Sequence, residues 1–159
     1  MVDDTVYFAA GIWPSDGFYL YALDAVTGKI RWSNDSSGGM HMGQPHGGAF
    51  AESGVIAQGY LVADKNHLYV PTGRAVPAVF DRETGEFKYF HLQANSAYGG
   101  SVVTLSNDFF INGGGMFEKS SGKRTARMPA RLVASTTDAL ITADGKKLSI
   151  AKWQGVTTP

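Results

Sequence analysis

The chain has 159 residues, of which 43% are hydrophobic and 20 are glycine, and its 14 acidic residues balance its 14 basic residues. This length suffices for one domain with a buried core, and zero net charge gives no reason to expect a nucleic-acid partner. The absence of cysteine excludes disulfides, thiolate metal sites and a cysteine nucleophile, and no apolar stretch approaches the ~20 residues that a membrane span needs.

The first predicted elements are a turn at Asp3-Asp4-Thr5, a strand over Val6–Ala10 and a hairpin whose turn follows Asp24. In this hairpin the Asp24 carboxylate can accept hydrogen bonds from backbone N–H groups two or three residues later, which closes the turn. Gly28 can supply the positive φ that such a loop needs. These features predict a β-hairpin between two short strands.

The same spacing of an acidic residue and a glycine returns twice further along the chain. Asp81 and Gly85 repeat it, with Thr84 before the glycine, and Glu118 and Gly122 form a weaker third copy. Three strand–turn–strand pairs, rich in β-branched and aromatic residues, lie between and after these hairpins, at 61–70, 102–111 and 132–141.

These elements combine into a unit of four short antiparallel strands that recurs every ~40 residues, which is typical of a β-propeller. No segment has a sustained helical period, so we predict an all-β fold with almost no helix. We treat the chain as one domain whose blades span about 1–33, 58–91, 100–128 and 130–159, with an insertion loop at 33–58. The first blade lacks its first strand and 147–153 forms the third strand of the last blade, so we expect a partial ring.

The hairpin motif resembles the tryptophan-docking motif of PQQ-like (quinoprotein-type) repeats. The first copy matches that motif at Ala22, Asp24, Thr27, Gly28 and Trp32. The second copy keeps Asp81, Thr84 and Gly85 but has Val79 and Tyr89 in place of alanine and tryptophan, and the third keeps Glu118 and Gly122. The resemblance implies an eight-bladed ring, of which this chain holds about four blades, with Trp32 buried as a contact between blades.

Strand order divides the connections between two ends of the blades. The turns after the first and third strands of each blade are short, whereas the other connections are long or irregular, and such loops often carry function. The candidate ligand-binding residues on these longer connections are Trp13, Arg74, His41 and His46. Trp13 could stack on a ligand ring and Arg74 could clamp a carboxylate or phosphate. The alternative is that these loops are solvated connectors.

The insertion also brings Met40, His41, Met42 and His46 close together in sequence. Thioether and imidazole ligands suit copper or a haem iron. The alternative is an irregular loop whose methionines and histidines pack on top of the propeller. Because so few ligand types are present, we predict no metal site. Residues 44–48 also resemble an uncharacterised group of large bacterial proteins that carry such propellers.

The family resemblance brings in one enzymatic possibility. Quinoprotein dehydrogenases hold PQQ on the ring axis near calcium and carboxylate ligands, usually beside a vicinal cysteine pair, and this chain has no cysteine and no Glu/Asn/Asp trio that aligns with the calcium ligands. We therefore expect no cofactor, no catalytic residue and a non-catalytic binding or scaffolding propeller of a larger bacterial protein. The alternatives are a fragment of a PQQ-dependent dehydrogenase whose cofactor and calcium ligands lie in absent blades, and a propeller appended to another enzyme.

The expected partners are another protein or the remaining blades of the same propeller. A partial ring leaves the faces of its end blades uncovered, and we expect apolar residues such as Tyr7, Leu20 and Ile150 on them. Two such chains paired around a two-fold axis would complete an eight-bladed ring as a homodimer. The family resemblance alone implies a periplasmic or other extracytoplasmic location.

Overall fold

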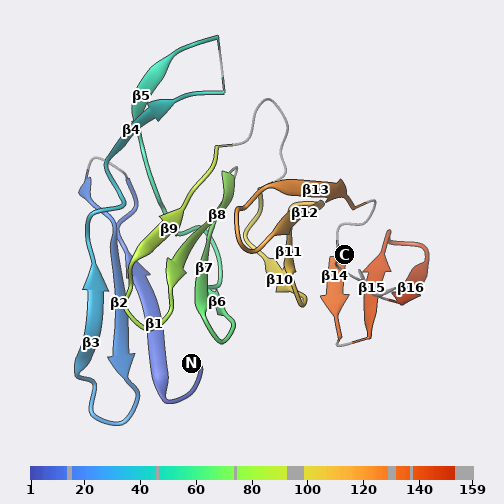
Figure 1. The fold of residues 1–159 in the computed structure, drawn as a ribbon, viewed down its shortest axis with the longest axis horizontal. Coiled ribbons are helices and arrows are strands. Elements are labelled where there is room, and N and C mark those ends of the chain that lie inside the picture. Colours follow the sequence, from blue (N-terminus) through green and yellow to red (C-terminus); the bar gives the residue numbers. More distant parts are fainter. Residues whose placement is uncertain are drawn as a thin grey trace.

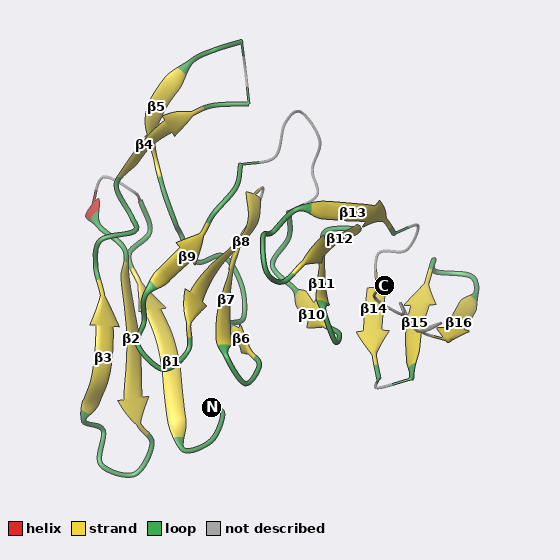
Figure 2. Cartoon of the chain, in the orientation of Figure 1, coloured by secondary structure: helices red, strands yellow, loops and turns green. Residues whose placement is uncertain are grey.

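The computed structural model describes residues 1–13, 16–45, 47–73, 75–92, 99–128, 132–136 and 138–152. Strands and turns make up almost all of these residues (Figure 2). None of the helices among them is long and apolar enough to span a membrane. The prediction of an all-β fold is confirmed.

Four antiparallel sheets follow one another along the chain, and we call them blades 1 to 4 (Figure 1). Blade 1 contains β1 (Thr5–Ala10), β2 (Tyr19–Asp24) and β3 (Ile30–Asn34). Blade 2 contains β6 (Val62–Ala63), β7 (His67–Thr72), β8 (Ala75–Asp81) and β9 (Phe87–Tyr89). Blade 3 contains β10 (Val103–Leu105), β11 (Phe109–Asn112), β12 (Gly115–Glu118) and β13 (Arg124–Arg127). Blade 4 contains β14 (Leu132–Ser135), β15 (Ala139–Ala143) and β16 (Leu148–Lys152).

The segment treated as an insertion loop contains regular structure that the sequence analysis missed. Here β4 (Met40–Gly43) and β5 (Phe50–Ser53) form a two-stranded antiparallel sheet, which Figure 1 shows projecting at the end of blade 1 opposite the β2–β3 turn. The reason is visible in the sequence of β4, where apolar Met40 and Met42 alternate with His41, a pattern that suits a half-buried strand. The strand is so short that this alternation is easily overlooked.

In blades 1 and 2 the acidic residue and the glycine of the motif close the hairpin turn as predicted, whereas in blade 3 the Glu118 carboxylate accepts a hydrogen bond from the Ser121 hydroxyl. Asp81 accepts hydrogen bonds at one carboxylate oxygen from the backbone N–H groups of Glu83 and Thr84 and from the Thr84 hydroxyl, at 2.9 to 3.0 Å. Asp24 makes the same set of bonds one blade earlier. Gly85 has a φ of 75°, in the left-handed region that favours glycine. The turn geometry is therefore repeated from blade to blade.

The buried apolar residues form two clusters, each lying between consecutive blades. One cluster joins residues of the blade 1 region to blade 2, and the other joins blade 2 to blade 3. Successive residues of β7 point in opposite directions, so Leu68 and Val70 pack toward blade 1 and Tyr69 toward blade 3. Blade 2 is thus covered on both faces, which explains why β7 and β8 are apolar almost throughout.

The end faces differ in part from the expectation. Ile150 is 67% exposed on β16, as predicted. The prediction was wrong for Leu20, which is fully buried, and for Tyr7, which packs against the same blade 1–blade 2 cluster. The uncovered face of blade 1 instead carries Phe8, which is 41% exposed and stacks on Tyr21 with ring centroids 4.9 Å apart. Tyr7 and Leu20 lie on the face of blade 1 that blade 2 covers, together with Ala9, and alternation along a strand does not tell which of its two faces the next blade covers.

Candidate functional site

Two of the four candidate ligand-binding residues lie in described parts of the chain. Trp13, in the β1–β2 connection, is 63% exposed. His41, on β4, is exposed and faces Glu52 on β5, with its Nδ1 3.2 Å from a carboxylate oxygen. No hydrogen bond or ring contact links Trp13 to His41 in the described structure. His46 and Arg74 lie outside the described residues.

Met40 and Met42 point away from His41. Both methionines pack against the blade 1–blade 2 cluster, whereas the His41 ring stacks on Phe50 on the outward side of the hairpin, with centroids 5.9 Å apart. The two methionine sulfurs and the His41 imidazole are therefore on opposite faces of β4. Across the described ranges, no three His, Asp or Glu side chains come together as a possible metal site.

The junction between blades 1 and 2, which we call seam 1, is built on Trp32. The indole N–H donates a 3.1 Å hydrogen bond to the Arg82 carbonyl, and the ring covers Gly85, where an added Cβ would lie 2.4 Å from a ring carbon. Two residues later, the Asn34 amide donates to the Gly85 carbonyl at 2.9 Å. Trp32 therefore makes the expected contact between blades, but it is only partly buried, so its burial was overestimated.

Seam 2, between blades 2 and 3, repeats this arrangement with different side chains. The Tyr89 hydroxyl donates a 2.7 Å hydrogen bond to the Lys119 carbonyl, and its ring covers Gly122, where an added Cβ would lie 2.5 Å from a ring carbon. His91 takes the place of Asn34, with Nε2 2.9 Å from the Ser121 carbonyl oxygen. Burial, and then the nearby Asp64 carboxylate, raise the pKa of Tyr89, so its hydroxyl remains a donor.

Basic residues at both seams were missed in the sequence. Arg82 and Lys119 each directly follow the acidic motif residue and reach back to the preceding blade. The Arg82 Nε donates to the Tyr7 hydroxyl at 3.1 Å, and the Lys119 ammonium donates to the Asp64 carboxylate at 2.9 Å. Burial alone would raise the pKa of Asp64, but Lys119 and two backbone N–H groups outweigh it and hold that pKa below its ordinary value. The signal available in the sequence was a basic residue directly after the acidic motif residue in both blades.

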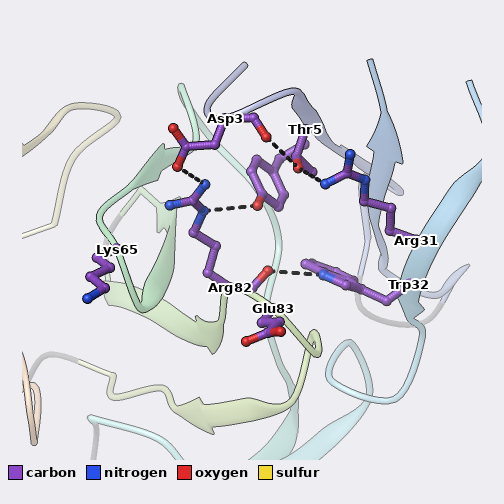
Figure 3. Close-up of a pocket in the computed structure, with 8 residues that line it drawn as sticks. Asp3, Thr5, Arg31, Trp32, Lys65, Arg82 and Glu83 are labelled. Atoms are coloured by element: carbon purple, nitrogen blue, oxygen red, sulfur yellow. Dashed lines mark hydrogen bonds and ion pairs between the residues drawn. The ribbon is translucent and has the colours of Figure 1, made fainter. Parts of the chain in front are cut away.

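Each seam has an open cavity at the end of the blades that carries the short turns. The seam 1 cavity has a volume of about 520 Å³ and is lined by Tyr7, Trp32, Arg31 and Arg82, among others (Figure 3). The seam 2 cavity has a volume of about 660 Å³, and Lys65 lines both. These cavities lie at the opposite end of the blades from the β4–β5 hairpin.

The two guanidinium groups beside the seam 1 cavity are committed to bonds within the fold. Arg31 donates to the Thr5 hydroxyl and the Asp24 carboxylate at 2.8 and 2.7 Å. Arg82 donates to the Tyr7 hydroxyl, the Asp64 carbonyl and the Asp3 carboxylate. Guanidinium groups that are already engaged in this way stabilise the seam and leave few donors for a ligand.

Seam 3, between blades 3 and 4, departs from the pattern. Four residues after the motif glycine, where blades 1 and 2 have Trp32 and Tyr89, blade 3 has Ala126. In blade 4, Lys152 pairs with Ala139 as Asp81 pairs with His67, so a lysine occupies the acidic position of the motif. The aromatic residue that joins the first two seams is therefore replaced by alanine at the third.

The comparisons with known proteins bear on the fold. No protein-family model and no curated protein matched the chain. BamB from Moraxella catarrhalis, a solved β-propeller structure, is similar over 98% of this chain and 46% of its own, with a TM-score of 0.57 and 21% identity. The computationally designed Ika4 protein is similar over 96% of this chain and 87% of its own, with a TM-score of 0.54 and 14% identity.

These likenesses concern the fold alone, because the sequence identities are low. The chain spans about half the length of BamB. The succession of small antiparallel sheets, with buried clusters between them, agrees with the architecture of that neighbour. The chain has an all-β fold and forms part of a β-propeller.

Proposed function

We propose that this chain is part of a PQQ-like repeat propeller that acts as a non-catalytic binding or scaffolding domain of a larger bacterial protein. The observation that carries the proposal is one inter-blade contact made twice, by Trp32 on Gly85 and by Tyr89 on Gly122. In both, the aromatic group donates a hydrogen bond to the backbone carbonyl that follows the acidic motif residue. The motif residues thus hold blades together, which supports a scaffolding role.

The two arginines at seam 1 support the same proposal. A catalytic or ligand-binding site needs donors and acceptors directed at the open volume, whereas Arg31 and Arg82 are directed at Thr5, Asp24, Tyr7 and other partners in the fold. The partner would then bind elsewhere. We propose the end of the blades that carries Trp13 and His41, where the longer connections lie.

The second candidate function is part of a PQQ-dependent quinoprotein dehydrogenase. The motif match at Ala22, Asp24, Thr27, Gly28 and Trp32 favours it, because the same repeats build those enzymes. Two observations count against it: the sequence has no Glu/Asn/Asp trio that aligns with the calcium ligands of those enzymes, and no three His, Asp or Glu side chains among the described residues come together as a metal site. Under this alternative, the ligands of PQQ and calcium would have to come from other blades.

The partner would be another protein or further blades of the same propeller. For a homodimer, two copies would cover each other's end faces, which carry Phe8 on blade 1 and Ile150 on blade 4. Sedimentation equilibrium tests this form, and a mass of 17.0 kDa at every micromolar concentration would contradict it. We propose a periplasmic or other extracytoplasmic location on the family resemblance alone.

The experiment that separates the two functions is a cofactor-binding measurement. The chain is incubated with PQQ and calcium, passed through gel filtration, and examined for quinone absorbance in the protein peak. The scaffolding proposal predicts that PQQ elutes separately from the protein. Co-elution of one equivalent of PQQ would overturn it in favour of the dehydrogenase.

A further inference from the structure

The β4–β5 hairpin is held firmly although it interrupts the repeat. The two backbone segments that flank the hairpin cross at Gly38 and Gly54. They lie so close together that a Cβ added to Gly54 would be 1.8 Å from the Gly38 carbonyl oxygen. Beside this crossing, the Val55 N–H donates to the Ser37 carbonyl at 3.0 Å, and Val55 is fully buried. With Met40 also packed on the core, the hairpin is a fixed projection of the propeller.

The register of the hairpin determines which backbone groups point outward. The Gln44 N–H donates to the Ala49 carbonyl at 2.8 Å, and pairs in an antiparallel ladder alternate between hydrogen-bonded and non-hydrogen-bonded. The His41–Glu52 and Gly43–Phe50 pairs are therefore of the non-hydrogen-bonded kind. Their N–H and C=O groups point away from the partner strand, toward the two edges, and no third strand pairs with either edge in the described structure.

The same residues also display the outward side chains of the hairpin. Phe50 is 67% exposed, and the side chains of His41 and Glu52 are 62% and 65% exposed. The Phe50 ring lies near Gly43, which has no side chain to cover it. The same ring stacks on the ring of His41. The β5 edge thus combines outward backbone groups with an apolar ring and a carboxylate two residues apart, whereas the β4 edge has glycine at one of its two positions.

We infer that the β5 edge binds an extended segment of a protein partner, which adds to the hairpin as a third strand. The backbone groups of Phe50 and Glu52 would pair with the segment, as in other cases of strand addition. Side chains directly opposite each other across a strand pair interact, so an apolar residue beside Phe50 and a basic residue beside Glu52 complement this edge. The segment therefore carries an apolar and a basic residue two positions apart. This inference rests on the proposed binding function and names its surface and its ligand.

The test uses the whole chain and defined peptides, observed through the backbone amide signals in ¹H–¹⁵N NMR. The probes are threonine heptapeptides with valine at the third and lysine at the fifth position, or in the reverse order, because the segment can run in either direction. The control peptides have glutamate in place of lysine. We expect shifts concentrated at 50–53, and binding about fivefold tighter for a lysine peptide than for its glutamate control, as for an exposed charge pair.

Matched variants separate the backbone contribution from the charge. Glu52→Lys should invert the preference between lysine and glutamate peptides, and Glu52→Ala should weaken binding only a few-fold. Glu52→Pro should abolish binding, because it removes an N–H that points to the edge and takes no part in the β4 ladder. His41→Pro makes the equivalent change at the other edge and should leave binding intact.

A measurement on the unchanged protein covers the case in which a proline variant distorts the hairpin. Peptides N-methylated at successive positions should lose binding at alternate positions only, because alternate residues of an added strand face β5. Shifts located away from the hairpin, equal affinity for the lysine and glutamate peptides, or no binding at millimolar peptide would overturn the inference. The proposed function is tested separately, by whether PQQ elutes with the protein. A failure of peptide binding therefore remains distinct from a failure of the proposed function.

Discussion

Replacing Trp32 by alanine tests how much the aromatic contact contributes to seam 1. The residue is only partly exposed, and about two-thirds of the ~200 Å² that a tryptophan can bury, at about 25 cal/mol per Å², corresponds to about 3 kcal/mol. The hydrogen bond to the Arg82 carbonyl adds about 1 kcal/mol. We expect Trp32→Ala to lower the free energy of unfolding by about 4 kcal/mol, within the range for buried aromatic residues.

Thermal unfolding followed by far-ultraviolet circular dichroism measures this effect without relying on tryptophan fluorescence. For a domain of this size, the expected loss corresponds to a fall in Tm of about 8–16 °C. Trp32→Phe, which keeps a ring but loses the N–H, should fall between the alanine variant and the wild type. The control is Trp13→Ala, which removes an exposed tryptophan and should change stability by no more than about 0.5 kcal/mol. A Trp32→Ala effect no larger than this control would refute the reasoning.

Three further predictions concern the other seams and the turns. At seam 2, Tyr89→Phe should cost about 1 kcal/mol in urea unfolding, because it removes the hydrogen bond to the Lys119 carbonyl, and an unchanged midpoint would contradict that bond. In the turn of blade 2, the hydrogen bond from the Thr84 backbone N–H holds the pKa of Asp81 below its ordinary value of 3.8. The charged carboxylate therefore stabilises the fold above that pH, and this stability is lost as the pH falls through the folded-state pKa. Asp81→Asn should therefore flatten the acid-side decline of Tm, and a decline identical to the wild type would exclude the effect. At seam 3, Ala126 replaces the aromatic residue, so native-state hydrogen exchange should be faster for Leu140 on β15 than for Leu68 on β7, and equal protection would show that another contact holds blade 4.

The repeat was predictable from the sequence because its signal is local. Asp24 and Asp81 sit at a fixed distance before a glycine, and a turn depends on neighbouring residues only. The order of strands within a blade followed from the same spacing. The docking of Trp32 onto the next blade could be expected only through the family resemblance, since nothing local specifies a contact with a residue 50 positions away.

The remaining features depend on contacts between distant residues. The alternation that defines β4 covers four residues, too few to separate a strand from an irregular loop. The reach of Lys119 to Asp64 links residues 55 positions apart, and a lysine beside a turn is usually solvated. The burial of Leu20 depends on which face of blade 1 the next blade covers, and alternation within β2 does not determine that face. These three features become evident only once the packing of the blades is known.

The most direct test of the account compares Gly85→Ala with Gly28→Ala. Both glycines have a positive φ, 75° and 69°, so both variants bear a similar backbone strain of about 1–2 kcal/mol. An added Cβ on Gly28 meets nothing within 4 Å, whereas on Gly85 it would displace the Trp32 ring. We predict that Gly85→Ala costs at least about 2 kcal/mol more than Gly28→Ala in denaturant unfolding, and that this excess disappears in a Trp32→Ala background. Equal costs for the two glycine variants in the wild-type protein would contradict the claim that the aromatic residue of one blade packs on the glycine of the next.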